Sequence, residues 1–211
     1  MQGNTVALTA STGKPGPPPT IKTCEALGKE NDKRREELKD ESSDKTIIGL
    51  DEEGQGTTVS SGKIGAGGGS TTMTAHSRQK ANERLGGLTE GGKMSDRQKG
   101  KSGLSCPPAK PYKHPSPSCQ KSGHAEARII DAAKPPAGAR VTFNIDWRPR
   151  NGDPPSKMPC ETCHGMICYA VKECKIEVYL CDQDGKPQKV TDKECPANKK
   201  NYQKLKTKMG E

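Results

Sequence analysis

The sequence predicts an α/β protein in which a mixed β-sheet carries helices packed on it. Apolar residues at helical and at alternating spacing succeed one another in the order helix, hairpin, helix, strand, helix, hairpin. Most of them lie between Ile129 and Leu180, where we expect the core. Only 28% of the 211 residues are hydrophobic and 3% are aromatic, so one compact domain with additional loosely held chain is expected.

Residues 1–43 are expected to be a tail or linker. Four prolines between Pro15 and Pro19 favour extended chain. Residues 24–41 are rich in helix-forming residues of both charges, but few apolar residues are available to face a core. We therefore expect a surface helix at most in this segment, and we place the domain itself at residues 44–211.

The domain is expected to begin with a hairpin. Residues 45–50 and 57–60 have strand-forming compositions and flank a Gly-rich turn. Glycine and proline are frequent across residues 62–122, which predicts a long irregular insertion with a short helix at about 77–85. Loops of this length are uncommon unless they are functional or disordered.

The second half of the chain has clearer periodicity. The expected elements are a helix over 123–134, a strand over 141–147, a helix over 163–174, strands over 176–180 and 188–191, and a helix over 196–208. Pro135 and Pro136 end the first of these helices. A tight turn over residues 182–186 joins the last two strands, so we expect them to be antiparallel.

Two short motifs in this half have the composition of a zinc site. The first is His124-Ala125-Glu126, and the second is Pro159-Cys160-Glu161-Thr162-Cys163. Together they match H-x-E followed by P-C-x-x-C, the signature of zinc-dependent base deaminases. His124, Cys160 and Cys163 would leave the fourth corner of a zinc tetrahedron open to water, as in catalytic sites. Glu126 is then the expected proton carrier and not a ligand.

The spacing within the motifs constrains their local structure. Cys160 and Cys163 are three residues apart and lie on one face of a helix, which Pro159 is suited to begin. A helix N-terminus and a zinc ion both favour thiolate over thiol. His124 and Glu126 are two residues apart, or about 200° around a helix, so His124 is expected at the helix entry.

Other interpretations of the same residues remain open. Cys160-Glu161-Thr162-Cys163-His164 also fits the CxxCH pattern of c-type haem attachment, with His164 and Met166 as axial ligands. The few aromatic residues and the unexplained HxE motif disfavour haem, and His164 is expected beside the site or at the surface. A structural zinc that uses Cys174 or Cys181 lacks a second CxxC pair, and plain buried thiols are a further alternative.

Residues 123 to about 180 resemble the cytidine-deaminase-like superfamily, and the short turn after Leu180 resembles its bacterial toxin branch. The resemblance implies a three-layer fold and one catalytic Zn²⁺ held by His124, Cys160 and Cys163. It also implies that Glu126 moves a proton from the water activated by zinc to the ring nitrogen and then to the leaving ammonia, so that cytosine becomes uracil. The insertion departs from the family, in which this connection is usually much shorter.

Substrate-binding residues are expected at the carboxyl end of the 141–147 strand. Trp147 is a candidate to stack on a base, and Arg148 and Arg150 are candidates to hold phosphate. Asn144 is a candidate for the polar wall of the pocket. A core role for Trp147 and a solvent-facing role for Asn144 are the alternatives.

The net charge of +9 favours a polyanionic partner. Residues 189–211 contribute seven lysines against three acidic residues. We expect nucleic acid as the partner, either single- or double-stranded DNA or RNA, with DNA favoured. An acidic protein partner or simple surface solvation would explain the same lysines.

Composition also bears on location. No apolar stretch is long enough to span a bilayer and no signal-peptide pattern is found at the start, so no membrane contact is expected. Of the nine cysteines, seven are not claimed by the zinc site, and the sequence leaves open whether they are thiols or disulfides.

The leading hypothesis from the sequence is a nucleic-acid cytosine deaminase that acts as a secreted bacterial toxin domain. Such a domain would be delivered into a target cell, act in its cytoplasm, and require a cognate immunity protein in the producer. The alternatives are a deaminase of free nucleosides or nucleotides, and a non-catalytic nucleic-acid-binding module stabilised by zinc.

Overall fold

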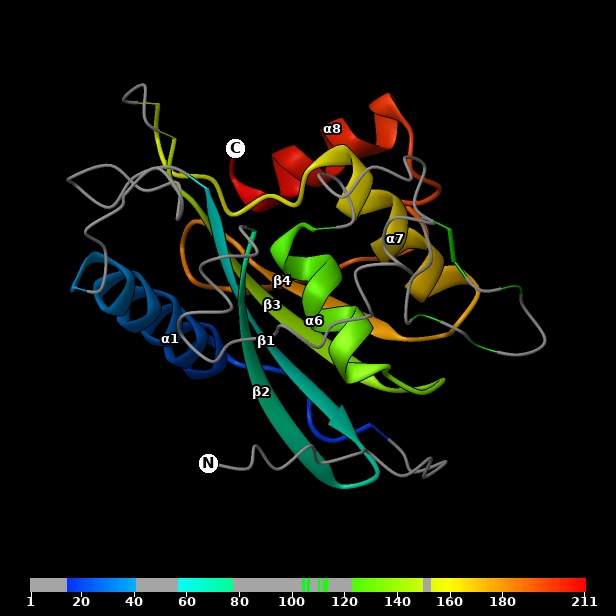
Figure 1. Ribbon diagram of the computed structural model, residues 1–211. Helices are drawn as coiled ribbons and strands as arrows, with labels where there is room; N and C mark the ends of the chain where they lie inside the picture. Colours follow the sequence, from blue (N-terminus) through cyan, green and yellow to red (C-terminus); the bar gives the residue numbers. More distant parts are fainter. Residues whose placement is uncertain are drawn as a thin grey trace.

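The protein is described by a computed structural model, which defines residues 15–40, 57–77, 104, 106, 110, 112, 113, 123–149 and 153–211 (Figure 1). In chain order its elements are α1 (Ile21–Asp40), β1 (Thr58–Ala66), β2 (Gly69–His76), α6 (Ala125–Ala133), β3 (Arg140–Trp147), α7 (Glu161–Lys172), β4 (Glu177–Cys181), β5 (Pro187–Lys189) and α8 (Lys199–Met209). The prediction of an α/β fold with a mixed sheet is confirmed.

The five strands form one sheet in the order β2-β1-β3-β4-β5. β3 and β4 are parallel and are joined by α7, the kind of crossover that parallel strands require. β1 is antiparallel to both β2 and β3, and β5 is antiparallel to β4. The antiparallel arrangement expected for the last two strands is therefore confirmed.

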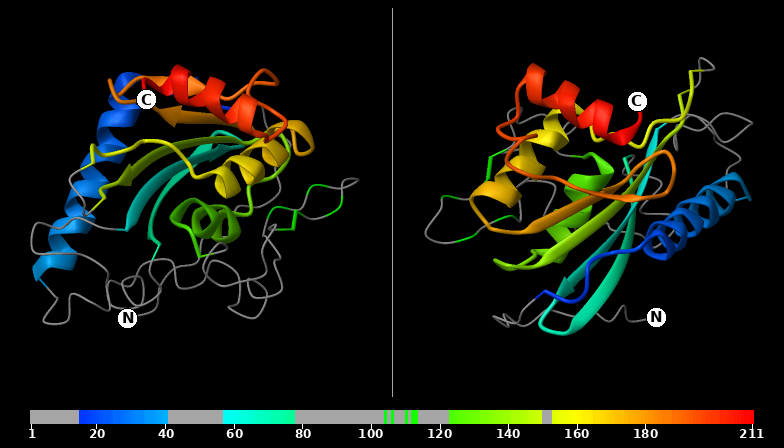
Figure 2. Two further views of the ribbon diagram at one scale, coloured as in Figure 1. Left: turned by 90° about the horizontal axis from the view of Figure 1, so that it is seen from above. Right: turned by 180° about the vertical axis from the view of Figure 1, so that it is seen from behind.

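Helices cover both faces of the sheet. Figure 2 shows α1 on one face and α6 and α7 on the other. Side chains of β3 alternate between these layers, as those of any strand do. Val141, Phe143 and Ile145 belong to the hydrophobic core with α6 and α7, whereas Asn144 and Asp146 contact α1.

The contact between α6 and the sheet depends on a glycine. A Cβ atom at Gly62 of β1 would lie 3.0 Å from Ile129 Cγ2 and 3.3 Å from the Phe143 ring, closer than side chains normally approach. α6 ends at Lys134, whose left-handed backbone (φ 43°) turns the chain before Pro135. These two features fix how far α6 extends and how closely it packs.

The predicted first hairpin is wrong in its pairing. Residues 57–60 do enter a strand, but β1 continues to Ala66 and pairs with β2, so residues 62–76 are not irregular insertion. Gly67 and Gly68, both with positive φ, form the turn between them. The Ser- and Thr-rich β2 lies at the edge of the sheet and lacks an apolar pattern. Residues 45–50, and all but Ser77 of the predicted 77–85 helix, lie outside the described residues.

The expectation that α1 belongs to a tail with no part in the domain is also wrong. Cys24, Leu27, Asn31, Arg35 and Leu38 form a buried stripe along this helix. The stripe includes polar residues because it packs on the polar face of β3. Asn31 Nδ2 donates to the Asn144 carbonyl oxygen at 3.0 Å, and Arg35 Nη2 donates to the Asp146 carbonyl oxygen at 2.7 Å.

A buried ion pair anchors α1 to the sheet. Arg35 Nε lies 2.5 Å from Asp146 Oδ2, and both side chains are almost fully buried. Burial raises the pKa of Asp146, but the charge and hydrogen bonds of Arg35 outweigh it, so this pKa falls below its ordinary value. Each charge in this pair therefore relies on the other for compensation.

Three disulfides join distant segments. Cys24–Cys181 links α1 to β4, and Cys168–Cys195 links α7 to the segment before α8. Cys106–Cys174 links Cys106, in the connection between β2 and α6, to the residues just after α7. Cys119 lies outside the described residues. Disulfides are typical of proteins that fold in oxidising compartments. Within the described ranges, no helix has the length and apolar character needed to cross a bilayer.

We expect Arg35→Ala to lower the free energy of unfolding by about 3 kcal/mol, because it removes the fully buried cation beside Asp146 and leaves the carboxylate with the more exposed Arg148 and Lys157. Urea denaturation measures the loss. Lys33→Ala on the same helix is the control. Lys33 is exposed and lies 3.9 Å from Glu37, so its removal should cost under about 1 kcal/mol. Equal effects of the two substitutions would contradict the anchoring role of Arg35.

Candidate metal centre and active site

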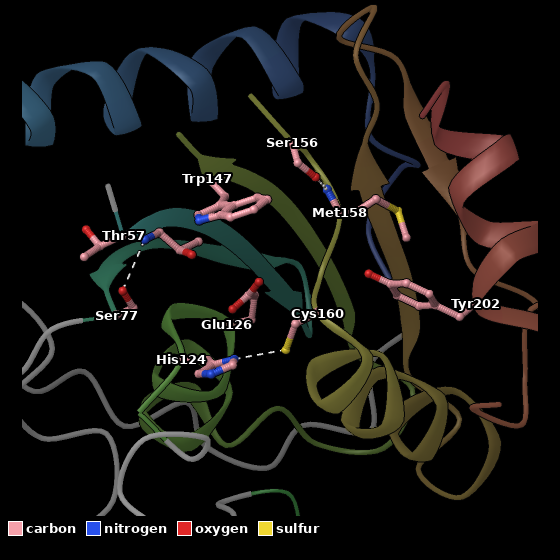
Figure 3. Close-up of a pocket in the computed structure, with 10 residues that line it drawn as sticks. Thr57, Ser77, His124, Glu126, Trp147, Ser156, Met158, Cys160 and Tyr202 are labelled. Carbon is pink, nitrogen blue, oxygen red and sulfur yellow. Dashed lines mark hydrogen bonds between the residues drawn. The ribbon is translucent and has the colours of Figure 1, made fainter. Parts of the chain in front are cut away.

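The structure brings together the three residues predicted as zinc ligands. His124 precedes α6, Cys160 precedes α7, and Cys163 lies in the first turn of α7. His124 Nδ1 lies 3.0 Å from Cys160 Sγ and 3.5 Å from Cys163 Sγ, and all three ligand atoms lie within 4.8 Å of one another (Figure 3). A metal ion could therefore contact all three at once.

Local backbone geometry explains why these side chains converge. His124 is the N-cap of α6 with extended backbone (φ −62°, ψ 148°), which confirms the expectation that it lies at the helix entry. Cys160 is the N-cap of α7, also extended, and its Sγ accepts a hydrogen bond from the Cys163 backbone N–H at 3.4 Å. The positive ends of two helix dipoles thus face the same cluster, which favours negative charge on sulfur.

The two thiols are strongly coupled. The hydrogen bond with Cys163 and the proximity of His124 lower the pKa of Cys160 to about 4, although burial acts in the opposite direction. The hydrogen bond with Cys160 and burial raise the pKa of Cys163 well above its ordinary value. These opposite shifts favour a thiolate at Cys160 beside a thiol at Cys163, and a cation that bound both sulfurs would displace the thiol proton.

The donor set fits zinc. Two cysteine sulfurs and one imidazole nitrogen are ligands that zinc prefers, and three protein ligands are typical of catalytic sites. Of the eight cysteines in the described ranges, only Cys160 and Cys163 are outside disulfides. They have thus remained available for a metal while the others have paired.

Glu126 lies beside the ligands and is not counted among them. Its Oε2 accepts a hydrogen bond from Cys163 Sγ at 3.5 Å, and its side chain is buried. Burial raises its pKa to about 6, with a further contribution from Cys160. In Figure 3 the carboxylate points into the pocket between His124 and Trp147, where a proton carrier would have to act.

An open pocket of about 590 Å³ adjoins this cluster. Its lining residues are Thr57, Thr58, Ser77, His124, Glu126, Trp147, Ser156, Met158, Cys160 and Tyr202. They come from the β1/β2 hairpin, the start of α6, the end of β3, the segment before α7, and α8. The volume suits a small-molecule ligand the size of a base or nucleotide.

The structure separates the four predicted substrate-binding residues. Trp147 lines the pocket and is 43% exposed, as a stacking residue requires. Asn144 is buried on the opposite face of β3, where its Nδ2 donates to the Cys24 carbonyl oxygen at 3.0 Å. Arg148 turns toward α1, with Nη2 2.6 Å from Asp32 Oδ1. The structure therefore places neither Asn144 nor Arg148 in the lining of the pocket, and Arg150 lies outside the described residues.

Sequence analysis missed most of the pocket wall. Tyr202 of α8 lines the pocket and its hydroxyl donates to the Pro159 carbonyl oxygen at 2.9 Å. Burial raises the pKa of Tyr202 to about 12, so this hydroxyl keeps its proton. Thr57 and Ser77 face the pocket from the ends of the hairpin. A threonine at φ 53° is unusual, and its hydroxyl lies 2.7 Å from His76 Nε2. This backbone conformation of Thr57 indicates an unusual site, but it can be recognised only in the structure and not in the sequence.

The residues of the alternative interpretations are engaged elsewhere. His164 was expected beside the site or at the surface, but it is buried with Nε2 2.9 Å from the Glu194 carbonyl oxygen. Met166 is buried in the core, so this pair does not present two axial ligands to a common space. Cys174 and Cys181, the candidates for a structural zinc, are in disulfides.

We expect the purified protein to contain one zinc ion per chain and the Cys160→Ser and Cys163→Ser variants to contain much less. Each substitution removes one of three protein ligands. Native mass spectrometry counts the bound metal. Trp147→Ala is the control because it alters the pocket without altering a ligand. Full zinc content in both cysteine variants would show that the metal binds elsewhere.

Comparisons of the chain with protein-family models, with curated proteins and with solved structures find no match. A fold by itself does not determine a function. The chemistry of His124, Glu126, Cys160 and Cys163 therefore decides which reactions this site supports.

Proposed function

We propose that this chain is a zinc-dependent hydrolytic deaminase that converts cytosine to uracil in nucleic acid, with DNA as the favoured substrate. One observation carries the proposal. A buried carboxylate, Glu126, lies 3.5 Å from the Cys163 sulfur of a two-cysteine, one-histidine cluster, and Glu126, His124 and Cys160 line an open pocket. This combination is the one that zinc-dependent base deamination requires.

Each group in the pocket has a role in that chemistry. Zinc bound by His124, Cys160 and Cys163 would lower the pKa of a bound water, and the resulting hydroxide would be the nucleophile. Glu126 would pass one proton of that water to the ring nitrogen of the base, and then move the second proton, from the hydroxyl formed on the ring carbon, to the amino group that leaves as ammonia. Its burial excludes bulk water from these transfers, and its position beside the ligands keeps the path of the proton short.

The pocket wall supports a planar base as the ligand. Trp147 presents an exposed aromatic ring on which a base can stack. Thr57 and Ser77 offer hydroxyl groups that can bond the polar edge of the base. The Thr57 hydroxyl is already fixed by His76, so it is oriented before the substrate binds.

The charge distribution favours a polymer over a free nucleoside. α8 contributes Tyr202 to the pocket and also carries the exposed Lys199, Lys200 and Lys204. A basic helix next to an aromatic-lined pocket suits a nucleic-acid strand, whose phosphates attract lysine while one base occupies the pocket. The net charge of +9 acts in the same direction.

We further propose that the domain is secreted and acts as a bacterial toxin after delivery into a target cell. Three disulfides support folding in an oxidising compartment. Uncontrolled conversion of cytosine in nucleic acid would damage any cell that holds the enzyme. A cognate immunity protein in the producing cell is the expected partner.

We expect Glu126→Gln to retain zinc and lose deamination by at least about 100-fold, because the amide cannot accept the proton. Deep sequencing of single-stranded DNA, double-stranded DNA and RNA after incubation measures C-to-U changes, and mass spectrometry measures zinc. Full activity of Glu126→Gln would contradict the assigned proton transfer. Zinc and nucleic-acid binding without any editing by the unaltered protein would favour a non-catalytic module, and editing of free cytidine alone would favour the nucleoside enzyme.

We expect Trp147→Ala to weaken substrate binding by about 5- to 150-fold, since loss of one base-stacking contact costs about 1–3 kcal/mol. The KM for an oligonucleotide measures the effect. Arg148→Ala is the matched control at the neighbouring position, because Arg148 faces Asp32 and Asp146 and does not line the pocket. A larger effect at Arg148 than at Trp147 would place the substrate on the other side of β3.

A further inference from the structure

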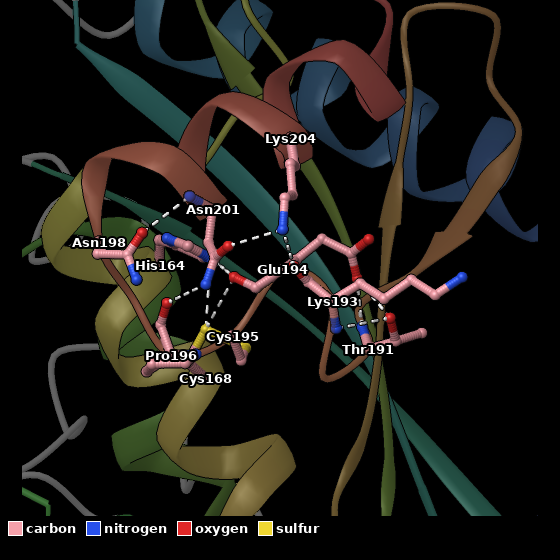
Figure 4. The surroundings of a disulfide bond; sticks show 10 residues. All are labelled: His164, Cys168, Thr191, Lys193, Glu194, Cys195, Pro196, Asn198, Asn201 and Lys204. Atoms are coloured by element: carbon pink, nitrogen blue, oxygen red, sulfur yellow. Dashed lines mark hydrogen bonds between the residues drawn. A yellow bond between two sulfur atoms is a disulfide. The ribbon is translucent and has the colours of Figure 1, made fainter.

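A second group of residues that could hold a metal ion lies between α7 and the segment before α8. It consists of His164, Cys168 and Cys195, and all three side chains are buried. His164 Nε2 lies 3.3 Å from Cys168 Sγ, and the ligand atoms of all three residues lie within 4.8 Å of one another. Cys168 and Cys195 are joined as a disulfide in this structure (Figure 4).

We propose that reduction of the Cys168–Cys195 disulfide creates a second metal site, in which His164, Cys168 and Cys195 bind one thiophilic divalent ion such as zinc. The same three residues would then cross-link α7 to the segment before α8 in either redox state. A covalent bond provides the link under oxidising conditions, and a metal ion provides it under reducing conditions. This inference does not depend on the proposed deaminase activity.

The geometry requires little rearrangement. Two thiolates on one zinc at about 2.3 Å are separated by about 3.8 Å in a tetrahedral site. The Cα atoms of Cys168 and Cys195 are 5.4 Å apart, so rotation of the two side chains can provide that separation. The Glu194 carbonyl oxygen lies 2.9 Å from His164 Nε2 and 3.6 Å from Cys168 Sγ, close enough to serve as a fourth, oxygen ligand.

The redox step balances with a dithiol as the reductant. The dithiol gives two electrons and two protons, its own disulfide closes, and the Cys168–Cys195 bond breaks to leave two thiols. Metal binding then releases both protons as the thiols become thiolates. Thioredoxin-like dithiols of a reducing cytoplasm have this chemistry, and dithiothreitol reproduces it in solution.

The link would help to hold α8, which forms part of the pocket wall. Cys195 begins the short segment that leads into α8, and α8 carries Tyr202. The Tyr202 ring also packs against the His164 ring, with centroids 5.5 Å apart. A domain that folds in an oxidising compartment and works in a reducing one would keep Tyr202 in place if a metal replaced the disulfide.

The other two disulfides lack this environment. Among the described residues, neither Cys24–Cys181 nor Cys106–Cys174 belongs to a group with histidine or acidic ligands close enough to hold a metal. Reduction is therefore expected to create a defined site at one of the three disulfides.

Zinc stoichiometry tests the proposal. The oxidised protein and the protein reduced with dithiothreitol are each equilibrated with zinc, freed of excess metal, and measured by native mass spectrometry. We expect reduction to add one zinc ion per chain. In His164→Gln the disulfide can still form when oxidised, but reduction should add no zinc, because one of three side-chain ligands is missing. Cys195→Ser, which leaves only two ligands, should likewise gain none.

Controls separate this site from the other six cysteines in the described part of the chain. Combined Ser substitutions at Cys24, Cys181, Cys106 and Cys174 should leave the added ion unchanged. Cys160→Ser with Cys163→Ser should lower the count in both redox states but keep the difference between them, so failure of the catalytic site would not be mistaken for failure of this one. No added zinc on reduction, or an equal gain in His164→Gln and Cys195→Ser, would overturn the proposal.

Discussion

The meeting of two helix N-termini on one face of the sheet is the constraint on which the site depends. α6 begins after His124 and α7 begins after Cys160, and these two N-cap side chains lie 3.0 Å apart. The contact exists because α6 packs on β1 and β2 while α7 packs on β4. Gly62 favours the first of these packings, since a Cβ atom there would come within 3.0 Å of Ile129 Cγ2. The positions of the metal ligands are therefore set by the core and not by the loops around them.

The two faces of β3 pack against different layers of helices. Its apolar side chains support α6 and α7, and thereby the ligand cluster. Its polar side chains bind α1 through a buried network in which Asp146 neutralises Arg35. Trp147, at the end of the strand, is not covered by either layer of helices and lines the pocket. A strand with two different buried faces explains why Asn144, which is close to Trp147 in sequence, is buried against α1 instead of in the pocket.

Much of the second half of this fold could be predicted from sequence, because apolar periodicity there is strong and local. The group of His124, Cys160 and Cys163 that could hold a metal was predictable because the HxE and PCxxC motifs each fix residue types over a short stretch of sequence. α1 and β2 were not, since α1 buries Asn31 and Arg35 against polar partners and β2 is an edge strand of Ser and Thr. Tyr202 and Thr57 reach the pocket from opposite ends of the domain, and the disulfides join residues up to 157 positions apart. Such contacts depend on tertiary packing, which spacing along the chain does not encode.

We propose that this pocket uses zinc to replace the amino group of cytosine with oxygen from water. The most direct measurement is mass spectrometry of cytosine-containing DNA, RNA and free cytidine after incubation with zinc-loaded protein in oxygen-18 water. We expect uracil with one heavy oxygen in nucleic acid, and ammonia as the other product. Intact cytosine in all three substrates, from protein that holds a full complement of zinc at His124, Cys160 and Cys163, would contradict it.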